Sequence, residues 1–289
     1  MSEYRIDAQR QRIGYDVRIG QRSQLAAING PATSLHIGDN VFIGDDVRIL
    51  APRVHIGDFC VIHHHATIYG YEEFTLGACS WIGQNAILNC TGPLTIGRGC
   101  TISALANVWT HFAGGDTLEG CNFNHRRAAT LGDDVWLGVQ CSMAPVAIGA
   151  RALVLAGSVV TKSIPPNTTW GGNPAADLTD KLGAPYTLKP LEEKFALMCE
   201  LLRDYHDSLR RAGGAFSGLG DVQFASAPKG GRFNLGNITV TMEEMAEDGS
   251  SIFDVRHRTY SKLRTPEEIG FMHFLLPVIK FYPRTQELR

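Results

Sequence analysis

The 289-residue sequence has no marked excess of charge and no long apolar run, and each absence excludes a class of protein. Lys and Arg number 27 and Asp and Glu 29, so the net charge is −2. This balance gives no electrostatic reason to expect binding to nucleic acid or to an anionic membrane. No stretch of about 18 apolar residues occurs, and we therefore expect no integral membrane segment.

A secretory signal and a disulfide framework are also missing. The first residues, MSEYRIDAQRQRIG, are polar and lack the apolar stretch of a signal peptide, which predicts a cytoplasmic protein. The seven cysteines are odd in number, and none is spaced from another cysteine or from a histidine in a way that suggests zinc. We therefore expect reduced cysteines and no metal.

The strongest positive feature is an aliphatic residue at every sixth position, often followed by glycine, as in Ile37-Gly38 and Ile43-Gly44. Coils of this repeat start at Ile37, Ile56, Leu76, Ile96, Leu131 and Ile148. A period of six fits neither an α-helix nor an alternating strand. Three such hexads form a coil with three flat sides, and stacked coils pair their strands in parallel around an aliphatic core. The repeat therefore predicts a parallel β-helix, in which the glycines permit tight corners.

The repeat also divides the chain into three predicted regions. Residues 1–183 form the β-helical domain, with residues 1–34 as an irregular first coil or lid. A loop without hexads interrupts it at about 107–130, and a long loop inside a regular body is often functional. Residues 184–232 are expected to form a helix and a Gly/Ser-rich linker, the helix packing against the β-helix or another subunit. Residues 233–289 are predicted to form a small α+β extension.

Several motifs that carry chemistry follow one another from the interruption onward. They are Thr110-His111, Leu131–Gly138, Ala156–Lys162 and Gly171–Ala175. Their order resembles the hexapeptide-repeat acyltransferases, in particular sugar O-acetyltransferases of the galactoside and maltose acetyltransferase kind. The resemblance covers roughly residues 35–178, and it implies a left-handed helix, although general rules for strand crossovers favour the right hand. The predicted fold class is therefore mainly β: a left-handed parallel β-helix of hexapeptide repeats with a C-terminal helix and a small α+β extension.

The resemblance further implies acetyl-CoA as cosubstrate and a hydroxyl of a carbohydrate or glycosylated molecule as acceptor. It also implies a homotrimer with sites between subunits. An acceptor hydroxyl is a weak nucleophile until a base removes its proton, and an imidazole that titrates near neutrality suits that task. His111, just before the interrupting loop, is the predicted general base. His125, in the same loop, is a rival base or a contact for the acceptor.

Other candidate site residues come from the same resemblance. Asn85 and Asn89 precede His111 by about one coil and are predicted to hold the acceptor, with a ladder of corner asparagines as the alternative. The predicted contacts for the donor are Ser142, Ala156, Gly157, Thr161 and Lys162. Trp136 is expected to pack a corner.

The sequence departs from the family pattern at one place. The family usually has Lys or Arg after Asn-Pro-Ala, whereas this chain has Ala176-Asp177 after Ala175. A basic contact to the 3′-phosphate of CoA is therefore in doubt, and Lys181 is the nearest substitute.

Three other functions stay open at this stage. The first is N-acylation of an amino-sugar nucleotide, with the same donor and base. The second is a zinc enzyme like the γ-carbonic anhydrases, which share the fold and bind zinc through three histidines. His63, His64, His65, His111 and His125 suggest that alternative, and the acyltransferase motif Gly171–Ala175 argues against it. His63 takes a position that glycine fills in other hexads, which predicts an exposed polar corner. The third is a scaffold without catalysis.

Overall fold

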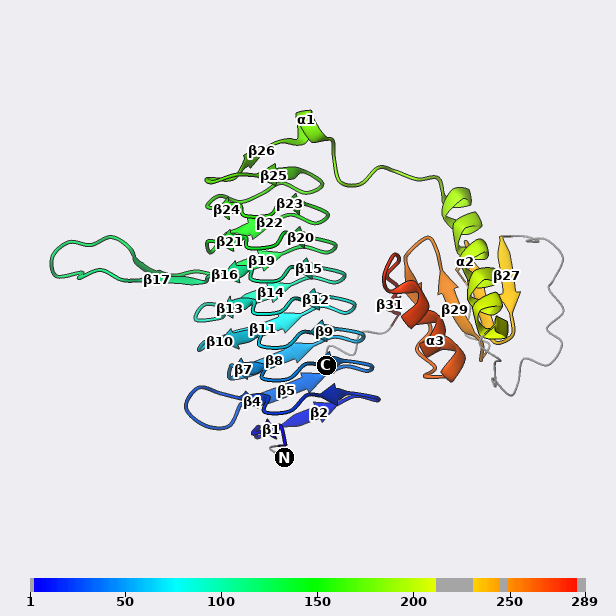
Figure 1. Cartoon of the computed structure of the whole chain (residues 1–289), viewed down its shortest axis with the longest axis horizontal. Helices are drawn as coiled ribbons and strands as arrows, with labels where there is room; N and C mark the ends of the chain where they lie inside the picture. Colours follow the sequence, from blue (N-terminus) through cyan, green and yellow to red (C-terminus); the bar gives the residue numbers. More distant parts are fainter. Residues whose placement is uncertain (1–2, 212–230, 245–248, 285–289) are drawn as a thin grey trace. The chain divides into compact units, whose positions relative to one another are not determined.

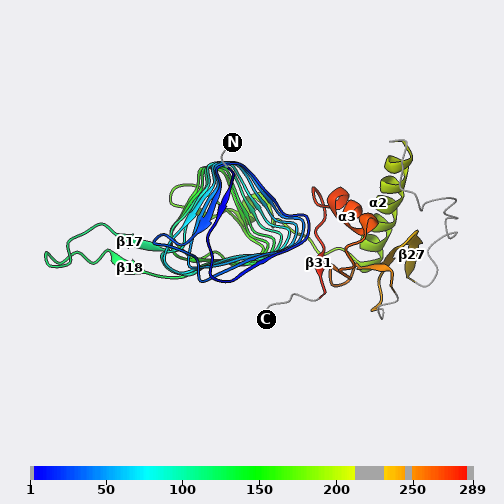
Figure 2. The ribbon, with the colours of Figure 1, turned by 90° about the horizontal axis from the view of Figure 1, so that it is seen from below.

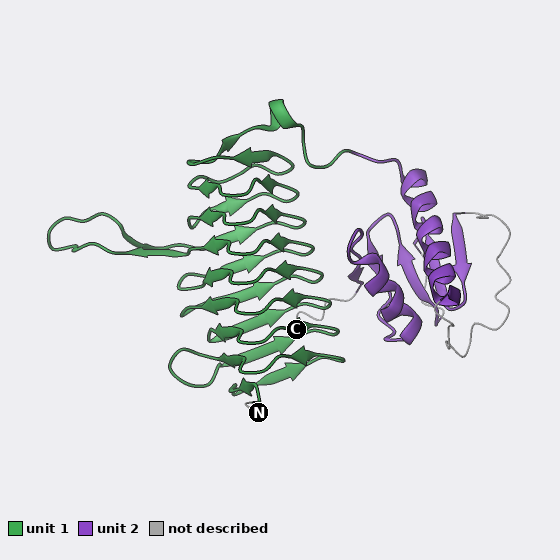
Figure 3. Ribbon diagram, in the orientation of Figure 1, with its two compact units in different colours: residues 1–187 green, residues 188–289 purple. Residues whose placement is uncertain are grey.

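The computed structural model describes residues 3–211, 231–244 and 249–284. The chain divides into two compact units, Met1–Thr187 and Leu188–Arg289 (Figure 3). Most of the linker expected within 184–232 lies outside the described residues. None of the described helices is both long and apolar enough to span a membrane.

The first unit is a β-helix whose coils stack so that strands of successive coils pair in parallel on three flat faces (Figures 1 and 2). Face 1 consists of β1 (Arg5–Ile6), β4 (Gln24–Ala26), β7 (Arg48–Leu50), β10 (Thr67–Tyr69), β13 (Ile87–Asn89), β16 (Asn107–Val108), β21 (Ser142–Met143) and β24 (Val159–Val160). Face 2 consists of β2 (Gln11–Ile13), β5 (Ser34–Ile37), β8 (Arg53–Ile56), β11 (Glu73–Leu76), β14 (Leu94–Ile96), β19 (Ala129–Leu131) and β22 (Ala147–Ile148). Face 3 consists of β3 (Arg18–Ile19), β6 (Phe42–Ile43), β9 (Val61–Ile62), β12 (Trp81–Ile82), β15 (Thr101–Ile102), β20 (Trp136–Leu137), β23 (Leu153–Val154), β25 (Thr169–Gly171) and the antiparallel β26 (Ala176–Asp177). A short helix, α1 (Thr179–Leu182), follows.

The core of this unit is the aliphatic ladder that the six-residue repeat predicts. On face 3, Ile43 pairs in register with Ile62, and the next coil adds Ile82, all three with no exposed surface. Burying one such side chain contributes roughly 1.5–3 kcal/mol. Because a single coil cannot enclose its own aliphatic residues, the stack of coils supplies this stabilisation.

The glycines after the aliphatic residues have a different cause from the one expected. A Cβ on Gly83 would lie 2.4 Å from the amide nitrogen of Ala104 in the next coil, and one on Gly57 would lie 2.5 Å from that of Ala78. The left-handed corner positions themselves carry other residues, such as His65 and Asn85 with φ of 61° and 56°. These glycines are therefore required by the close approach of stacked backbones and not by a left-handed turn.

The N-terminal end of the β-helix is more regular than the sequence predicted. The expected irregular coil at 1–34 is wrong, because β1 pairs with β4, β2 with β5 and β3 with β6 in parallel register. At the C-terminal end, β25 pairs in parallel with β23, within the residues predicted for the β-helical domain.

The interruption predicted at about 107–130 is a two-stranded arm. Asn107 and Val108 still belong to the ladder of face 1. The chain then forms β17 (His111–Ala113) and β18 (Asn124–Arg126), which pair antiparallel, and rejoins the repeat at β19. This segment, residues 109–128, is called the arm below; it projects from the corner between faces 1 and 2 (Figures 1 and 2).

The second unit is a small α+β domain. Helix α2 (Leu191–Arg211) and helix α3 (Pro266–Leu275) accompany a sheet in the order β27 (Arg232–Leu235), β28 (Ile238–Thr241), β29 (Ser251–Asp254), β30 (Thr259–Tyr260) and β31 (Tyr282–Pro283). The apolar stripe of α2 packs on β28 and α3 of its own unit, through residues such as Leu202 and Tyr205. The apolar stripe of α2 is therefore covered within its own unit, which the sequence had not led us to expect.

Candidate active site

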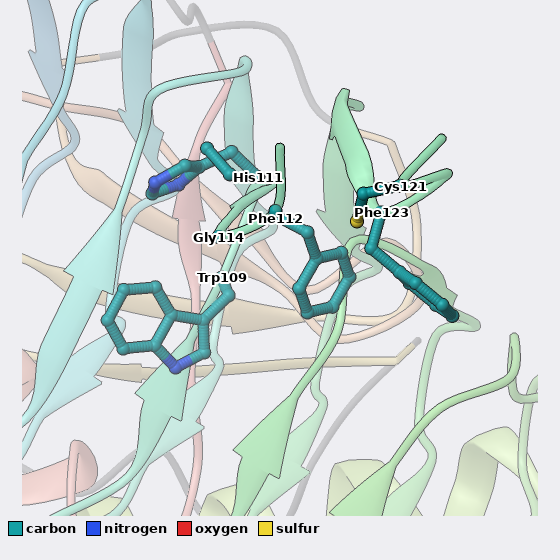
Figure 4. Close-up of a pocket in the computed structure, with 8 residues that line it drawn as sticks. Trp109, His111, Phe112, Gly114, Cys121 and Phe123 are labelled. Carbon is teal, nitrogen blue, oxygen red and sulfur yellow. The ribbon is translucent and has the colours of Figure 1, made fainter. Parts of the chain in front are cut away.

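The arm begins beside a cavity of about 670 Å³. The cavity is lined by Trp109, His111, Phe112, Ala113, Gly114, Gly115, Cys121 and Phe123. Figure 4 shows Trp109 and His111 on one side of the strand and Phe112 on the side of Cys121 and Phe123. His111 is partly buried, whereas Phe123 keeps 71 % of its surface exposed. The imidazole thus stands at the base of the arm in a largely aromatic recess.

His111 is anchored to a buried amide. Its Nδ1 lies 2.9 Å from Oδ1 of Asn89, which ends β13 and has no exposed surface. The same Oδ1 accepts a hydrogen bond from the backbone N–H of Thr91 at 3.1 Å. Nδ2 of Asn89 donates to Oγ1 of Thr91 at 3.1 Å and to the carbonyl oxygen of Tyr69 at 3.4 Å.

Thr110 completes this cluster from the arm side. Its buried hydroxyl lies 2.7 Å from Oδ1 and 3.1 Å from the carbonyl oxygen of Asn89, and it accepts from the N–H of Gly92 at 2.9 Å. These bonds connect two successive corners of the β-helix to the first residue of β17. The orientation of His111 is therefore fixed by the fold of two coils and not by the arm alone.

The two asparagines predicted to hold the acceptor lie at different places. Asn89 is buried and its amide is fully used within the cluster around His111, so it cannot reach an acceptor directly. Asn85 is exposed at the corner between faces 3 and 1, with a φ of 56°. It belongs to a column of left-handed corner residues that includes His65 and Gly157.

His125 lies on the other face of the arm from His111. In the register of the two strands, His111 pairs with Arg126 and Phe112 pairs with His125. Paired residues of an antiparallel ladder point to the same face, so the faces of these two pairs are opposite. The ring centroids of Phe112 and His125 are 5.3 Å apart, edge to face. His125 therefore points to the opposite face of the arm from His111, and it is not among the residues that line the cavity.

The residues predicted to contact the donor divide between two edges of face 1. Ser142 lies on the face itself, in register with Asn107. Continuing the register of Val108, Met143 and Val160 by one residue places the exposed Thr161 in the same column as Trp109. Lys162 follows it at the corner from which the arm leaves. Ala156 and Gly157 are exposed at the opposite edge, between faces 3 and 1.

His63, His64 and His65 lie between β9 and β10, at the corner between faces 3 and 1 and away from the arm. His63 is not the exposed residue we expected: its ring centroid lies 4.9 Å from that of Trp81. Burial and the neighbouring His64 lower its pKa. Within the described ranges, no group of three or more His, Cys, Asp or Glu side chains is arranged to hold a metal ion.

Trp136, expected to pack a corner, stands on face 3 in register with Thr101 and Leu153. Its side chain is 54 % exposed, and its Nε1 donates to Oγ of Ser103 at 3.1 Å. The cavity residues Trp109, Phe112 and Phe123 were not predicted from the sequence. The available signal was three aromatic residues within the segment that interrupts the repeat, where the aliphatic core does not require them.

Comparison with known proteins supports the fold and the family. Residues 35–63 and 129–162 match the family model described as the hexapeptide repeat of succinyl-transferase. WcaF of Escherichia coli K12, which carries the name of a colanic acid biosynthesis acetyltransferase, is 31 % identical over 149 residues, covering 50 % of this chain and 69 % of WcaF. The bifunctional protein GlmU of Listeria welshimeri is 29 % identical over 131 residues, which are 43 % of this chain and 25 % of GlmU.

Among solved structures, the polySia-specific acetyltransferase NeuO is similar over 66 % of this chain and 94 % of its own, with a TM-score of 0.41 and 19 % identity. The parallel three-faced ladder and the hexapeptide match confirm the predicted fold class, a left-handed parallel β-helix followed by a helix and a small α+β extension. The match to WcaF covers more than two thirds of that relative. The chain belongs to the family of hexapeptide-repeat acyltransferases, as its motifs predicted.

Proposed function

We propose that this protein is an acetyl-CoA-dependent O-acetyltransferase that acts on a hydroxyl of a carbohydrate or glycosylated acceptor, with His111 as the general base. The observation that carries the proposal is the imidazole of His111, held by a buried amide at the edge of an aromatic recess. The name of WcaF supports an acetyl donor and an acceptor from polysaccharide synthesis. The proposed setting is the cytoplasm.

The reaction needs one proton acceptor and no covalent enzyme intermediate. His111 removes the proton of the acceptor hydroxyl as its oxygen attacks the thioester carbonyl of acetyl-CoA. The new C–O bond forms and the C–S bond then breaks, and the imidazolium returns its proton to the departing thiolate. A backbone N–H aimed at the tetrahedral oxyanion would stabilise the transition state.

The donor is proposed to lie along the edge of face 1 from which the arm leaves, beside the coils that follow the arm in the sequence. Thr161 and Lys162 stand two coils beyond Trp109 at the corner of the arm, which corresponds to roughly 10 Å at the usual spacing of strands. Ser142 lies on the adjoining face. Small exposed side chains there allow a pantetheine chain to approach the backbone, and Lys162 supplies a positive charge for a phosphate.

A homotrimer accounts for the remaining predicted residues. Asn85, Ala156 and Gly157 lie at the other edge of face 1, so they cannot join His111 within one protomer. A neighbouring copy that presents this edge to the arm would complete a site with contributions from two chains. Phe112, Leu118 and Phe123 of the arm are 40 %, 90 % and 71 % exposed, which is consistent with a partner covering them.

The proposal is tested by thiol release from acetyl-CoA with a panel of mono- and oligosaccharides, followed by mass spectrometry of the product. We expect acceptor-dependent release, an acetyl ester that mild alkali removes, and a loss of roughly 10²–10⁴-fold in His111→Ala. His125→Ala tests the rival base, because it removes an imidazole from the same arm on the other face. Unchanged turnover in His111→Ala would overturn the role of the base, and an alkali-stable product would indicate N-acylation.

A further inference from the structure

We propose that Asn89 is a positioning residue that holds His111 in the tautomer with its proton on Nδ1, so that Nε2 is free to accept the proton of the acceptor. The inference rests on the proposed function for its catalytic consequence. Its structural part, the position of one proton, stands on the hydrogen bonds alone.

The first step is the orientation of the amide. At Asn89 the oxygen and nitrogen are distinguished by their partners. The atom named Oδ1 receives the backbone N–H of Thr91 at 3.1 Å, and an N–H can only donate. The atom named Nδ2 faces the carbonyl oxygen of Tyr69 at 3.4 Å, which can only accept. Both partners are backbone groups, so the amide cannot be flipped without losing both bonds.

The second step follows from the first. The oxygen of Asn89 is 2.9 Å from Nδ1 of His111, and a carbonyl oxygen only accepts. If Nδ1 were unprotonated, two lone pairs would face each other at that distance inside a buried cluster. Nδ1 therefore carries the proton in neutral His111, and the lone pair of the imidazole is on Nε2.

The third step is rigidity. Asn89 has no exposed surface, so water cannot replace a lost partner. Thr110 closes the cluster, because its hydroxyl accepts from the N–H of Gly92 and has both oxygens of Asn89 as acceptors. If the tautomer of His111 is fixed before the acceptor binds, no fraction of the enzyme molecules has the imidazole in the unreactive form. The loss that a wrong tautomer causes is known to be large in other His-dependent enzymes.

The neutral amide also has a consequence for pH dependence. An amide oxygen orients the imidazole without adding a full negative charge beside it. A carboxylate at the same place would keep the acceptor oxygen and would stabilise the imidazolium, which raises the pKa of the histidine. Asn89→Asp therefore separates the two properties: it preserves the tautomer and shifts the acid limb of the pH–rate profile to higher pH.

The experiment compares wild type, Asn89→Asp and Asn89→Ala by acetyl transfer across pH, with nitrogen-15 NMR of the histidines assigned through His111→Gln. We expect the wild-type imidazole to be protonated at Nδ1 in its neutral form. Asn89→Ala should lose about 10²-fold in kcat with little change in the KM for the acceptor. Asn89→Asp should recover much of that loss at high pH, with its acid limb displaced upward.

Three results would overturn the inference. They are a neutral wild-type His111 protonated at Nε2, an Asn89→Ala variant with wild-type kcat, or an Asn89→Asp profile that coincides with that of wild type. If either variant fails to fold in thermal melts, the NMR of the wild type still decides the tautomer. Retained activity in His111→Ala would instead contradict the proposed function and leave the tautomer measurement standing.

Discussion

Two corners of the β-helix present histidines, and they hold them in opposite ways. At the corner with the arm, Nδ1 of His111 faces the oxygen of Asn89, which can only accept. At the corner between faces 3 and 1, the backbone N–H of Asp45 donates to Nδ1 of His64 at 2.9 Å. Neutral His64 therefore keeps its proton on Nε2, which leaves no free lone pair directed to solvent. The comparison teaches that hydrogen-bond partners, and not the number of histidines, decide which imidazole can act as a base.

The largest expected effect is the difference in turnover between substitutions at these two corners. His111→Ala should lower acetyl transfer by roughly 10²–10⁴-fold, because it removes the one imidazole among the residues that line the cavity. His64→Ala should lose far less turnover, since the backbone N–H of Asp45 donates to Nδ1 of His64 and keeps its proton on Nε2, so that this imidazole cannot act as the base. Steady-state rates with a common acceptor measure both. Equal losses would end the distinction between the corners.

The next effect concerns the support of His111. Thr110→Val keeps the shape of a buried side chain but leaves the N–H of Gly92 without its acceptor, which costs about 1–3 kcal/mol of unfolding free energy. Thr101→Val is the matched control, because Thr101 points outward from face 3 and is partly exposed. Urea denaturation of the two variants would show the difference. A Thr110→Val variant as stable as Thr101→Val would mean that water or a neighbour replaces the hydroxyl.

Backbone packing should also differ between a corner of the β-helix and the arm. Gly83→Ala places a Cβ 2.4 Å from the amide nitrogen of Ala104, so the stacked coils must separate at a cost of about 1–3 kcal/mol. Gly114→Ala in the arm meets no atom within 4 Å and should be nearly neutral. Thermal melts compare the two directly. Equal melting temperatures would show that the stack can yield at its corners.

The smallest effect is a dependence of stability on pH. Burial lowers the pKa of His63, so the unfolded chain takes up a proton at that position before the folded one does. The contribution of neutral His63 is complete above its ordinary pKa and is lost as pH falls below it. His63→Gln should therefore lose less melting temperature than wild type between pH 7 and pH 5. An identical pH dependence in the two proteins would contradict this.

The repeat in the sequence was sufficient to predict the fold of the first unit, because the spacing of Ile43, Ile62 and Ile82 already indicates which residues meet in the core. Family motifs then singled out His111. The second unit was predicted as a small α+β extension, and the structure gives the positions of its strands, such as the hairpin of β27 and β28 that turns at Gly236. Short strands with few residues give local patterns too little length to separate a strand from a turn.

What the sequence determined by itself was the period of the chain, and hence the faces, the ladder and the corners, since a fixed repeat of inward side chains allows few other arrangements. What only the tertiary structure decided was which residues meet at a corner. Asn89 is 22 residues from His111 in the chain, yet its amide oxygen lies 2.9 Å from the imidazole. Asn85, equally plausible from sequence, faces another corner. The physical reason is that a coil brings residues about 20 positions apart into register, while a shift of four along the coil moves a side chain to the other edge of a face.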